Sequence, residues 1–359
     1  MIAKIETTVL WPGKREGTAW FHPKATRTPK SIFLTAQRIS GSDVYHHAHF
    51  TESFDDGKTW TNRQPIPGLE RKVLGGGYED LLCDVVPEYH APTKSILCLA
   101  SDVHYLNDKL TKPFTDRWIR YFTRRPDNTW TPPRKLEFEH PAATQTMSAG
   151  CGQRLTLTNG DVLVPCYMGS EQTPRAVTTL LCAFNGDTLT VKRHGRILHY
   201  AIRRGLLEPS LARVAGQYWM TIRAEDNRGY FSTSPDGLAW SDIRPYNFDD
   251  GSPLVTSTTQ QHWITHRGTL WLSYTRKDAS NEHTFRWRTP TWLAQFDTVN
   301  KVLIKSTERI AIPMDGNAYH GNFHPVNIGP KETWITNCDL LLEPQFRGDT
   351  TITRLHWAN

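Results

Sequence analysis

A short turn motif with the order Ser, Asp, Gly and Trp occurs twice in this chain. It reads SFDDGKTW at residues 53–60 and SPDGLAW at residues 234–240. The Asp-Gly pair favours a tight turn between two strands, and the Asp and Ser side chains can bond to the amides of that turn. The Trp can fill the space beneath it. The motif therefore predicts two similar β-hairpins and a chain built from repeated units.

Weaker forms of the same turn recur along the chain, at Asp127, Asp187 and Asp297. Together with Asp56 and Asp236, they are separated by roughly 50 to 70 residues, which is enough chain for a four-stranded unit. Five outer hairpins, and a sixth unit closed by the two ends of the chain, predict a six-bladed β-propeller.

Short strands separate these turns. Apolar and polar residues alternate at 31–36, 161–165, 218–222 and 269–274, and helical periodicity is almost absent. Such a pattern is typical of an all-β sandwich, barrel or propeller, and the repeat favours the propeller. Because no low-complexity linker divides the 359 residues, we expect one domain over residues 1–359.

Charge and hydropathy exclude two classes of partner. The chain has 42 Lys and Arg against 36 Asp and Glu, a net charge of +6, but its basic residues are scattered. Proteins that bind nucleic acid usually concentrate their basic residues on one face. Apolar runs are far shorter than the roughly 18–20 residues of a membrane span. We therefore expect neither a nucleic-acid partner nor a membrane.

The six cysteines form no C-x-x-C pair, and most lie within apolar strand-like runs. We expect buried free thiols, as in a reducing compartment. The segment Met1–Trp11 lacks the apolar core of a secretion signal, which favours a cytoplasmic protein over a secreted one whose signal has been removed. The close spacing of His46, His47 and His49 is not a usual ligand motif, so no metal or other cofactor is expected.

Propeller geometry predicts which side chains meet at the axis. The first two strands of each blade are antiparallel, so the start of one and the end of the next lie on the same face. Applied to each blade, and extended in blade five to Arg286 and Arg288 at the opening of its third strand, this rule gives a larger set. Nine acids, arginines and histidines are selected from it: His22, Asp43, Asp84, Glu208, Arg223, His262, Arg276, Arg288 and His324. Each also has a structural alternative. Glu208 and Arg223 could simply pair with each other, and Asp43 could stabilise the turn in which it lies.

The chemistry of this set suits the cleavage of a glycosidic bond beside an anionic sugar. Carboxylates supply a general acid, a base or a nucleophile, and the planar fork of arginine binds a carboxylate through two parallel hydrogen bonds. We therefore assign catalytic roles and substrate binding separately. The catalytic candidates are Asp43, Glu208, His262 and His324, and the substrate-binding candidates are His22, Asp84, Arg223, Arg276 and Arg288.

The segment Ser-x-Asp-x-Gly-x-Thr-Trp resembles the Asp-box, or BNR repeat, of the sialidase-like propellers. Glu208, then Arg223, then the second motif resemble one blade of that family. The chain is most similar to a divergent member of the uncharacterised bacterial exo-sialidase-like proteins. In the exo-sialidases three arginines clamp the substrate carboxylate, a tyrosine activated by a glutamate is the nucleophile, and an aspartate is the acid/base. The resemblance implies that Glu208 is the activating glutamate, that Arg223 is the second arginine and that Asp43 is the acid/base. Arg288, or alternatively Arg276, resembles the third arginine.

Two positions depart from the family pattern. His22 stands where the first arginine belongs, in the stretch Phe21-His22-Pro23. Tyr319 precedes the position of the nucleophilic tyrosine by a few residues, and that position holds Asn322, Phe323 or His324. Both departures count against ordinary sialic-acid hydrolysis.

Three functions remain open on this basis. The first is a hydrolase that removes a terminal acidic sugar from an oligosaccharide or glycan. The second is a lyase for a uronate-linked glycan, with His262, His324 or His22 as the base. The third is a non-catalytic glycan-binding propeller. The sequence indicates no oligomeric state.

Overall fold

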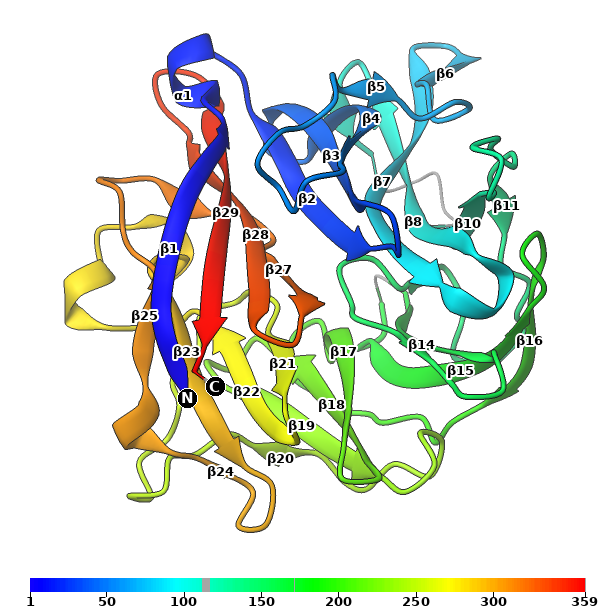
Figure 1. Ribbon diagram of the computed structural model, residues 1–359. Helices are drawn as coiled ribbons and strands as arrows, with labels where there is room; N and C mark the ends of the chain where they lie inside the picture. The colour runs from blue at the N-terminus through cyan, green and yellow to red at the C-terminus, as the bar shows by residue number, and fades with distance from the viewer. Residues whose placement is uncertain (112–116, 171, 359) are drawn as a thin grey trace.

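A computed structural model describes residues 1–111, 117–170 and 172–358 (Figure 1). In this part of the chain the strands form six antiparallel sheets, which are the blades of the predicted propeller. The six-bladed, all-β prediction is therefore confirmed.

The first three blades follow one another along the chain. Blade one contains β2 (Trp20–Arg27), β3 (Ile32–Gly41), β4 (Val44–Ser53) and β5 (Gln64–Pro65). Blade two contains β6 (Lys72–Gly75), β7 (Tyr78–His90), β8 (Ser95–Leu106), β9 (Lys109–Leu110), β10 (Ile119–Arg124) and β11 (Arg134–Lys135). Blade three contains β12 (Thr146–Ser148), β13 (Leu155–Thr156), β14 (Val162–Gly169), β15 (Ala176–Phe184) and β16 (Leu189–His194).

Blades four to six complete the ring, and the last of them joins the two ends of the chain. Blade four contains β17 (Leu207–Val214), β18 (Gln217–Arg223), β19 (Gly229–Ser234) and β20 (Arg244–Pro245). Blade five contains β21 (His262–His266), β22 (Thr269–Tyr274), β23 (Thr291–Asp297), β24 (Val302–Leu303) and β25 (Arg309–Ile312). Blade six contains β26 (Tyr319–His320), β27 (His324–Gly329), β28 (Glu332–Leu341), β29 (Arg347–Trp357) and β1 (Ile2–Trp11). The antiparallel pair of β1 and β29 closes the ring, as Figure 1 shows.

Helical segments are short. The α-helix α1 spans Gly13–Glu16, and 3-10 turns span Ala91–Thr93, Ala279–Asn281, Phe285–Trp287 and Lys305–Thr307. In the described residues, no helix is both long and apolar enough to cross a membrane.

The two turn motifs close outer hairpins with the same hydrogen bonds. In the second motif, Oδ1 of Asp236 accepts the amides of Leu238 and Ala239 at 2.9 and 2.7 Å. In the first motif the corresponding aspartate is Asp55, whose Oδ1 accepts the Thr59 amide at 2.8 Å. Asp56, in the predicted Asp-Gly pair, instead adopts a left-handed φ of 57° and pairs with an arginine of blade one. The prediction of the turn is correct, but the bonding aspartate lies one residue earlier.

The hydrophobic core lies mainly between adjacent blades. Trp240, which ends the second motif, is 2% exposed, and its indole N–H donates to Oγ1 of Thr179 in the neighbouring blade at 2.9 Å. Another cluster joins blades four and five through Trp219, Trp263 and Phe296. The six cysteines are buried free thiols, as the sequence predicted. This packing fixes the inner strands, whose ends surround the axis.

Candidate active site

A cavity of about 340 Å³ lies where the ends of the inner strands converge. All six blades contribute to its wall, and most of the lining side chains are polar or charged. Of the nine residues predicted from strand ends, six line it: His22, Asp43, Asp84, Glu208, Arg223 and Arg288. The strand-end rule therefore brings most of the candidate set to one place.

Glu208 and Arg223 face the cavity from neighbouring strands of blade four. The β17–β18 register is broken between Leu207 and Ser210, and Glu208 adopts a left-handed φ of 44° there. Nη1 of Arg223 lies 2.9 Å from each oxygen of the Glu208 carboxylate. The bulge re-aims Glu208 towards the guanidinium, as bulges beside functional sites commonly do.

Arg288 reaches the same wall from the segment before β23, and Thr258 holds both arginines. Oγ1 of Thr258 accepts Nη2 of Arg223 at 2.8 Å, and its carbonyl oxygen accepts Nη2 of Arg288 at 3.1 Å. Arg223 and Arg288 are only 7% and 9% exposed. Burial, followed by repulsion from Arg223, lowers the pKa of Arg288 to about 10. The two buried guanidiniums thus stand close together on one wall of the cavity.

Asp43 lies at the exposed rim of the cavity, in the turn between β3 and β4. Its backbone has a left-handed φ of 57°, and its carbonyl oxygen accepts the hydroxyl of Tyr105 at 2.7 Å. The hydroxyl of Tyr45 donates to Oδ1 of Asp43 at 3.2 Å. Asp43 therefore lies both in the turn and in the cavity wall. Its two predicted roles, in the turn and in the site, are compatible.

Tyr319 also lines the cavity, at 6% exposure, although the sequence placed it too early for the nucleophile position. The inner strand of blade six is interrupted: β26 ends at His320 and β27 starts at His324. The break lifts Tyr319 to the cavity and leaves His324 deeper along the axis. Burial raises the pKa of the Tyr319 phenol, and the Arg288 guanidinium acts against that shift.

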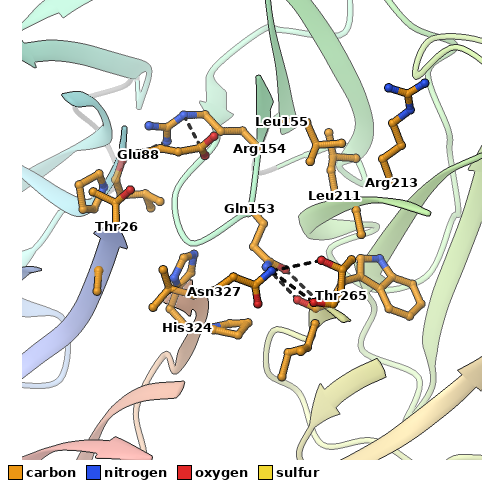
Figure 2. A pocket seen from close by; sticks show the side chains of 18 residues that line it. Thr26, Glu88, Gln153, Arg154, Leu155, Leu211, Arg213, Thr265, His324 and Asn327 are labelled. Carbon is orange, nitrogen blue, oxygen red and sulfur yellow. Dashed lines mark hydrogen bonds and ion pairs between the residues drawn. The ribbon is translucent and has the colours of Figure 1, made fainter. Parts of the chain in front are cut away.

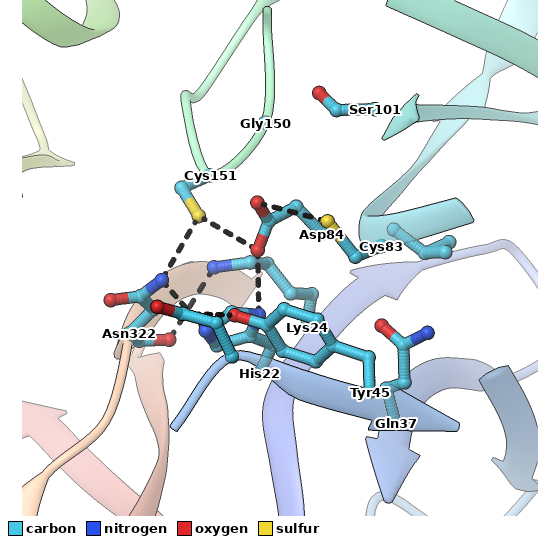
Figure 3. Close-up of polar contacts among 12 residues, drawn as sticks. His22, Lys24, Gln37, Tyr45, Cys83, Asp84, Ser101, Gly150, Cys151 and Asn322 are labelled. Atoms are coloured by element: carbon cyan, nitrogen blue, oxygen red, sulfur yellow. Dashed lines mark hydrogen bonds and ion pairs between the residues drawn. The ribbon is translucent and has the colours of Figure 1, made fainter. Parts of the chain in front are cut away.

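His22 and Asp84 form a buried ion pair in the cavity wall (Figure 3). Nδ1 of His22 lies 2.6 Å from Oδ1 of Asp84, and the side-chain amide of Asn322 contacts Nε2 of His22 at 2.7 Å. Burial raises the pKa of Asp84, but His22, Arg117 and Lys24 outweigh it and hold that pKa below its ordinary value. Both ring nitrogens of His22 thus contact protein groups.

Arg117 lines the cavity as well and was not predicted. Its Nη2 lies 3.3 Å from Oδ2 of Asp84, and it belongs to an irregular segment just before β10. In blade two the strand-end rule covered only the first two strands, so it gave no signal for Arg117.

His262 and His324 lie below the cavity, further along the inner strands. Their rings are 5.3 Å apart, and burial lowers the pKa of both far below the ordinary value, which leaves them neutral. His324 borders a second cavity of about 320 Å³, shown in Figure 2. Some polar groups there bond to one another; Gln153, for example, exchanges two hydrogen bonds with the backbone of Trp263. The structure does not bring these two histidines together with Glu208.

Arg276 also lies outside the cavity. Its Nε is 3.0 Å from Oε1 of Glu308, and its guanidinium lies 4.6 Å above the ring of Trp292. These contacts secure the loop that follows β22. Of the two candidates for the third arginine, Arg288 alone faces the cavity.

Comparison with solved structures finds similar folds at low sequence identity. Trypanosoma rangeli sialidase in complex with the inhibitor DANA has a TM-score of 0.69 and 13% identity, over 99% of this chain and 60% of that one. A protein of unknown function from Dyadobacter fermentans has a TM-score of 0.69 and 15% identity, over 99% and 100%. A Hadza microbial sialidase has a TM-score of 0.70 and 13% identity, over 98% and 68%.

No family model matches the chain, and no curated protein matches it in sequence. This chain spans about 60% of the length of the trypanosomal sialidase. At 13–15% identity the likeness establishes the fold and leaves activity open. The chain has the six-bladed β-propeller fold of the sialidase structures.

Proposed function

We propose that this protein is a glycoside hydrolase that removes a terminal acidic sugar from a glycan. One observation carries the proposal: Arg223 and Arg288, both buried, are held on Thr258 and face the same cavity. Two guanidiniums so close together repel each other, and a bound anion relieves that repulsion. A sugar carboxylate matches their planar donor geometry.

Asp43 is suited to the role of acid/base. Its carboxylate stands at the exposed rim, where the glycosidic oxygen of a sugar held by the deeper arginines would lie. In its protonated form it would donate a proton to that oxygen as the bond breaks, and the carboxylate so formed would then accept a proton from the water that completes hydrolysis.

Tyr319 is suited to attack the anomeric carbon. A carboxylate nucleophile would be repelled by the acidic substrate, whereas a phenol is neutral until it reacts. Within the described residues no hydrogen bond joins Glu208 to Tyr319, but Arg288 is electrostatically coupled to both. Glu208 would accept the phenolic proton once a substrate carboxylate competes for Arg223.

The structures of similar fold add indirect support. Trypanosoma rangeli sialidase has been solved with sialic acid, and with 2,3-difluorosialic acid as a covalent intermediate. These ligands are acidic sugars. Because the sequence resemblance puts His22 where the family has one clamp arginine, we extend to this chain the class of acidic sugars and not sialic acid itself.

A screen of oligosaccharides with different terminal acidic sugars, analysed by product mass, tests the proposal. Hydrolysis adds the mass of one water to the sum of the products, whereas elimination does not. Release of a terminal acidic sugar with the added water supports the proposal. Cleavage of neutral glycans alone would show that the two arginines do not bind a carboxylate.

A lyase that acts on a uronate-linked glycan is the second candidate. His22 is the one predicted histidine base that lines the cavity, and Asp84 would stabilise its protonated form. Its two occupied nitrogens count against this role. Products with an unsaturated uronate, lost in His22→Ala, would favour the lyase over the hydrolase.

A further inference from the structure

We propose that the sugar on the leaving-group side of the scissile bond carries an anionic group, which binds Arg286 while its ring stacks on Phe285. This inference rests on the proposed hydrolase and adds the class of its second sugar. The two residues lie at the rim of the cavity, in the segment that also delivers Arg288.

Phe285 offers an apolar face beside the expected reaction centre. Phe285 is 40% exposed, and its ring centroid lies 5.1 Å from that of Tyr319. Aromatic rings provide rigid apolar surface against which the C–H face of a sugar can pack. Because the deep arginines bind the terminal sugar, an exposed ring beside Tyr319 faces the next one.

Arg286 is an unused positive charge at this rim. Three other arginines of the cavity wall already face carboxylates: Arg117 with Asp84, Arg204 with Glu225 and Arg223 with Glu208. In the described part of the chain Arg286 makes no ion pair and no side-chain hydrogen bond, and its guanidinium lies 4.8 Å above the Phe285 ring. An exposed guanidinium fixed above an aromatic ring has donors available for an incoming anion.

The backbone holds this pair in an uncommon conformation. Arg286 and Trp287 are consecutive non-glycine residues with left-handed φ values of 54° and 53°. The turn is bonded internally, with the Arg288 amide donating to the Phe285 carbonyl at 3.2 Å, and Nζ of Lys277 lies 3.9 Å from the Trp287 ring centroid. Such strain persists where surrounding contacts enforce it, often at binding sites. It directs Arg288 inwards and Arg286 to the rim.

The test compares leaving groups that differ only in charge. The acidic sugar identified by the screen is linked to galactose, to galactose 6-sulfate or to galacturonate, and also to 4-methylumbelliferone as a small neutral leaving group. In parallel, direct binding of lactose and lactose 6′-sulfate is measured by ligand-observed NMR. The variants are Arg286→Gln, Phe285→Ala and the control Arg267→Gln, which removes an exposed arginine at the distant β21–β22 turn.

We expect the wild-type protein to prefer the sulfated or the carboxylated leaving group by roughly three- to tenfold in kcat/KM, as suits one exposed charge contact. Arg286→Gln should abolish the preference, with the umbelliferyl substrate measuring any effect of the variant on the reaction itself, and Arg267→Gln should retain the preference. Phe285→Ala should raise KM for all the disaccharides. The preference should weaken as ionic strength rises. The galacturonate and sulfate arms show which anion is favoured.

A preference that is absent in the wild type, or that persists in Arg286→Gln, overturns the inference. If lactose 6′-sulfate binds through Arg286 but no acidic glycan is cleaved, the rim site stands and the proposed hydrolase fails. If acidic glycans are cleaved without regard to the charge of the leaving group, the hydrolase stands and the rim site fails.

Discussion

Both carboxylate oxygens of Glu208 lie 2.9 Å from Nη1 of Arg223 in the wall of the cavity. A second Glu-Arg pair in the same molecule, Glu308 with Arg276, has a similarly buried glutamate but lies outside the cavity. One pair can therefore be altered as a control for the other, which separates a catalytic role from a structural one.

We predict that Glu208→Gln lowers kcat by roughly 10²- to 10⁴-fold, because it removes the base that would accept the Tyr319 proton. Binding of the acidic sugar should persist, since Arg223 and Arg288 remain. Glu308→Gln should cost about 1–3 kcal/mol of unfolding free energy through loss of a charged hydrogen bond, and should leave kcat unchanged. Steady-state kinetics and thermal unfolding of both variants check this. Full turnover in Glu208→Gln would show that Glu208 is not the base that accepts the Tyr319 proton.

Replacement of Asp43 by Asn should affect substrates according to their leaving group. If Asp43 protonates the glycosidic oxygen, Asp43→Asn should slow cleavage of a natural disaccharide by roughly 10²- to 10³-fold. An aryl glycoside with an acidic phenol as leaving group needs little protonation and should lose far less. The ratio of kcat/KM for the two substrates is the measurement. Equal losses on both substrates would mean that Asp43 stabilises its turn and does not protonate the leaving group.

The fold could be predicted because each blade carries its own local signals. The hairpin at 234–240 and the alternating strand at 218–222 need no distant contact to be recognised. The strand-end rule then placed Glu208 and Arg223 at the cavity, because antiparallel pairing fixes which ends share a face. These features depend on local sequence and regular geometry.

Other parts of the site depend on irregular backbone that the sequence pattern does not reveal. The gap between β26 and β27 moves Tyr319 to the cavity and leaves His324 below it. A shift of a few residues along an inner strand carries a side chain from the mouth to the interior, since each residue advances about 3.3 Å. Arg117 enters from a segment beyond the first two strands of its blade. Only the packed structure places these groups.

Tyr319→Phe should remove nearly all turnover, because no other group in its place could form the bond to the anomeric carbon. Tyr167 is a matched control: it also lines the cavity and is 7% exposed, against 6% for Tyr319. Tyr167→Phe should keep kcat within about an order of magnitude, as expected for loss of a single hydroxyl. Mass spectrometry of wild-type protein treated with a slow fluorinated substrate should locate an adduct on Tyr319. An adduct on another residue would refute this assignment.

Asp339 should make the stability of the protein depend on pH between about pH 4 and 6. Its Oδ2 lies 2.6 Å from Nζ of Lys14, but burial, assisted by repulsion from Asp315 and Asp349, outweighs Lys14 and raises the pKa of Asp339 from 3.8 to about 6. The folded state therefore binds the proton more tightly than the unfolded state does. The stabilisation is fully present below pH 3.8, and it is lost as the pH rises through about 6.

The corresponding variant is Asp339→Asn, which keeps the shape of the side chain and removes its charge. A pKa rise of this size corresponds to about 2–3 kcal/mol of unfolding free energy. The free energy of unfolding of the variant minus that of the wild type should therefore be larger at pH 7.5 than at pH 4.5. Urea unfolding at both pH values measures this difference. Asp242→Asn, at a carboxylate that is 85% exposed, should show no such change. The same difference between Asp339→Asn and wild type at both pH values would mean that Lys14 keeps Asp339 ionised throughout.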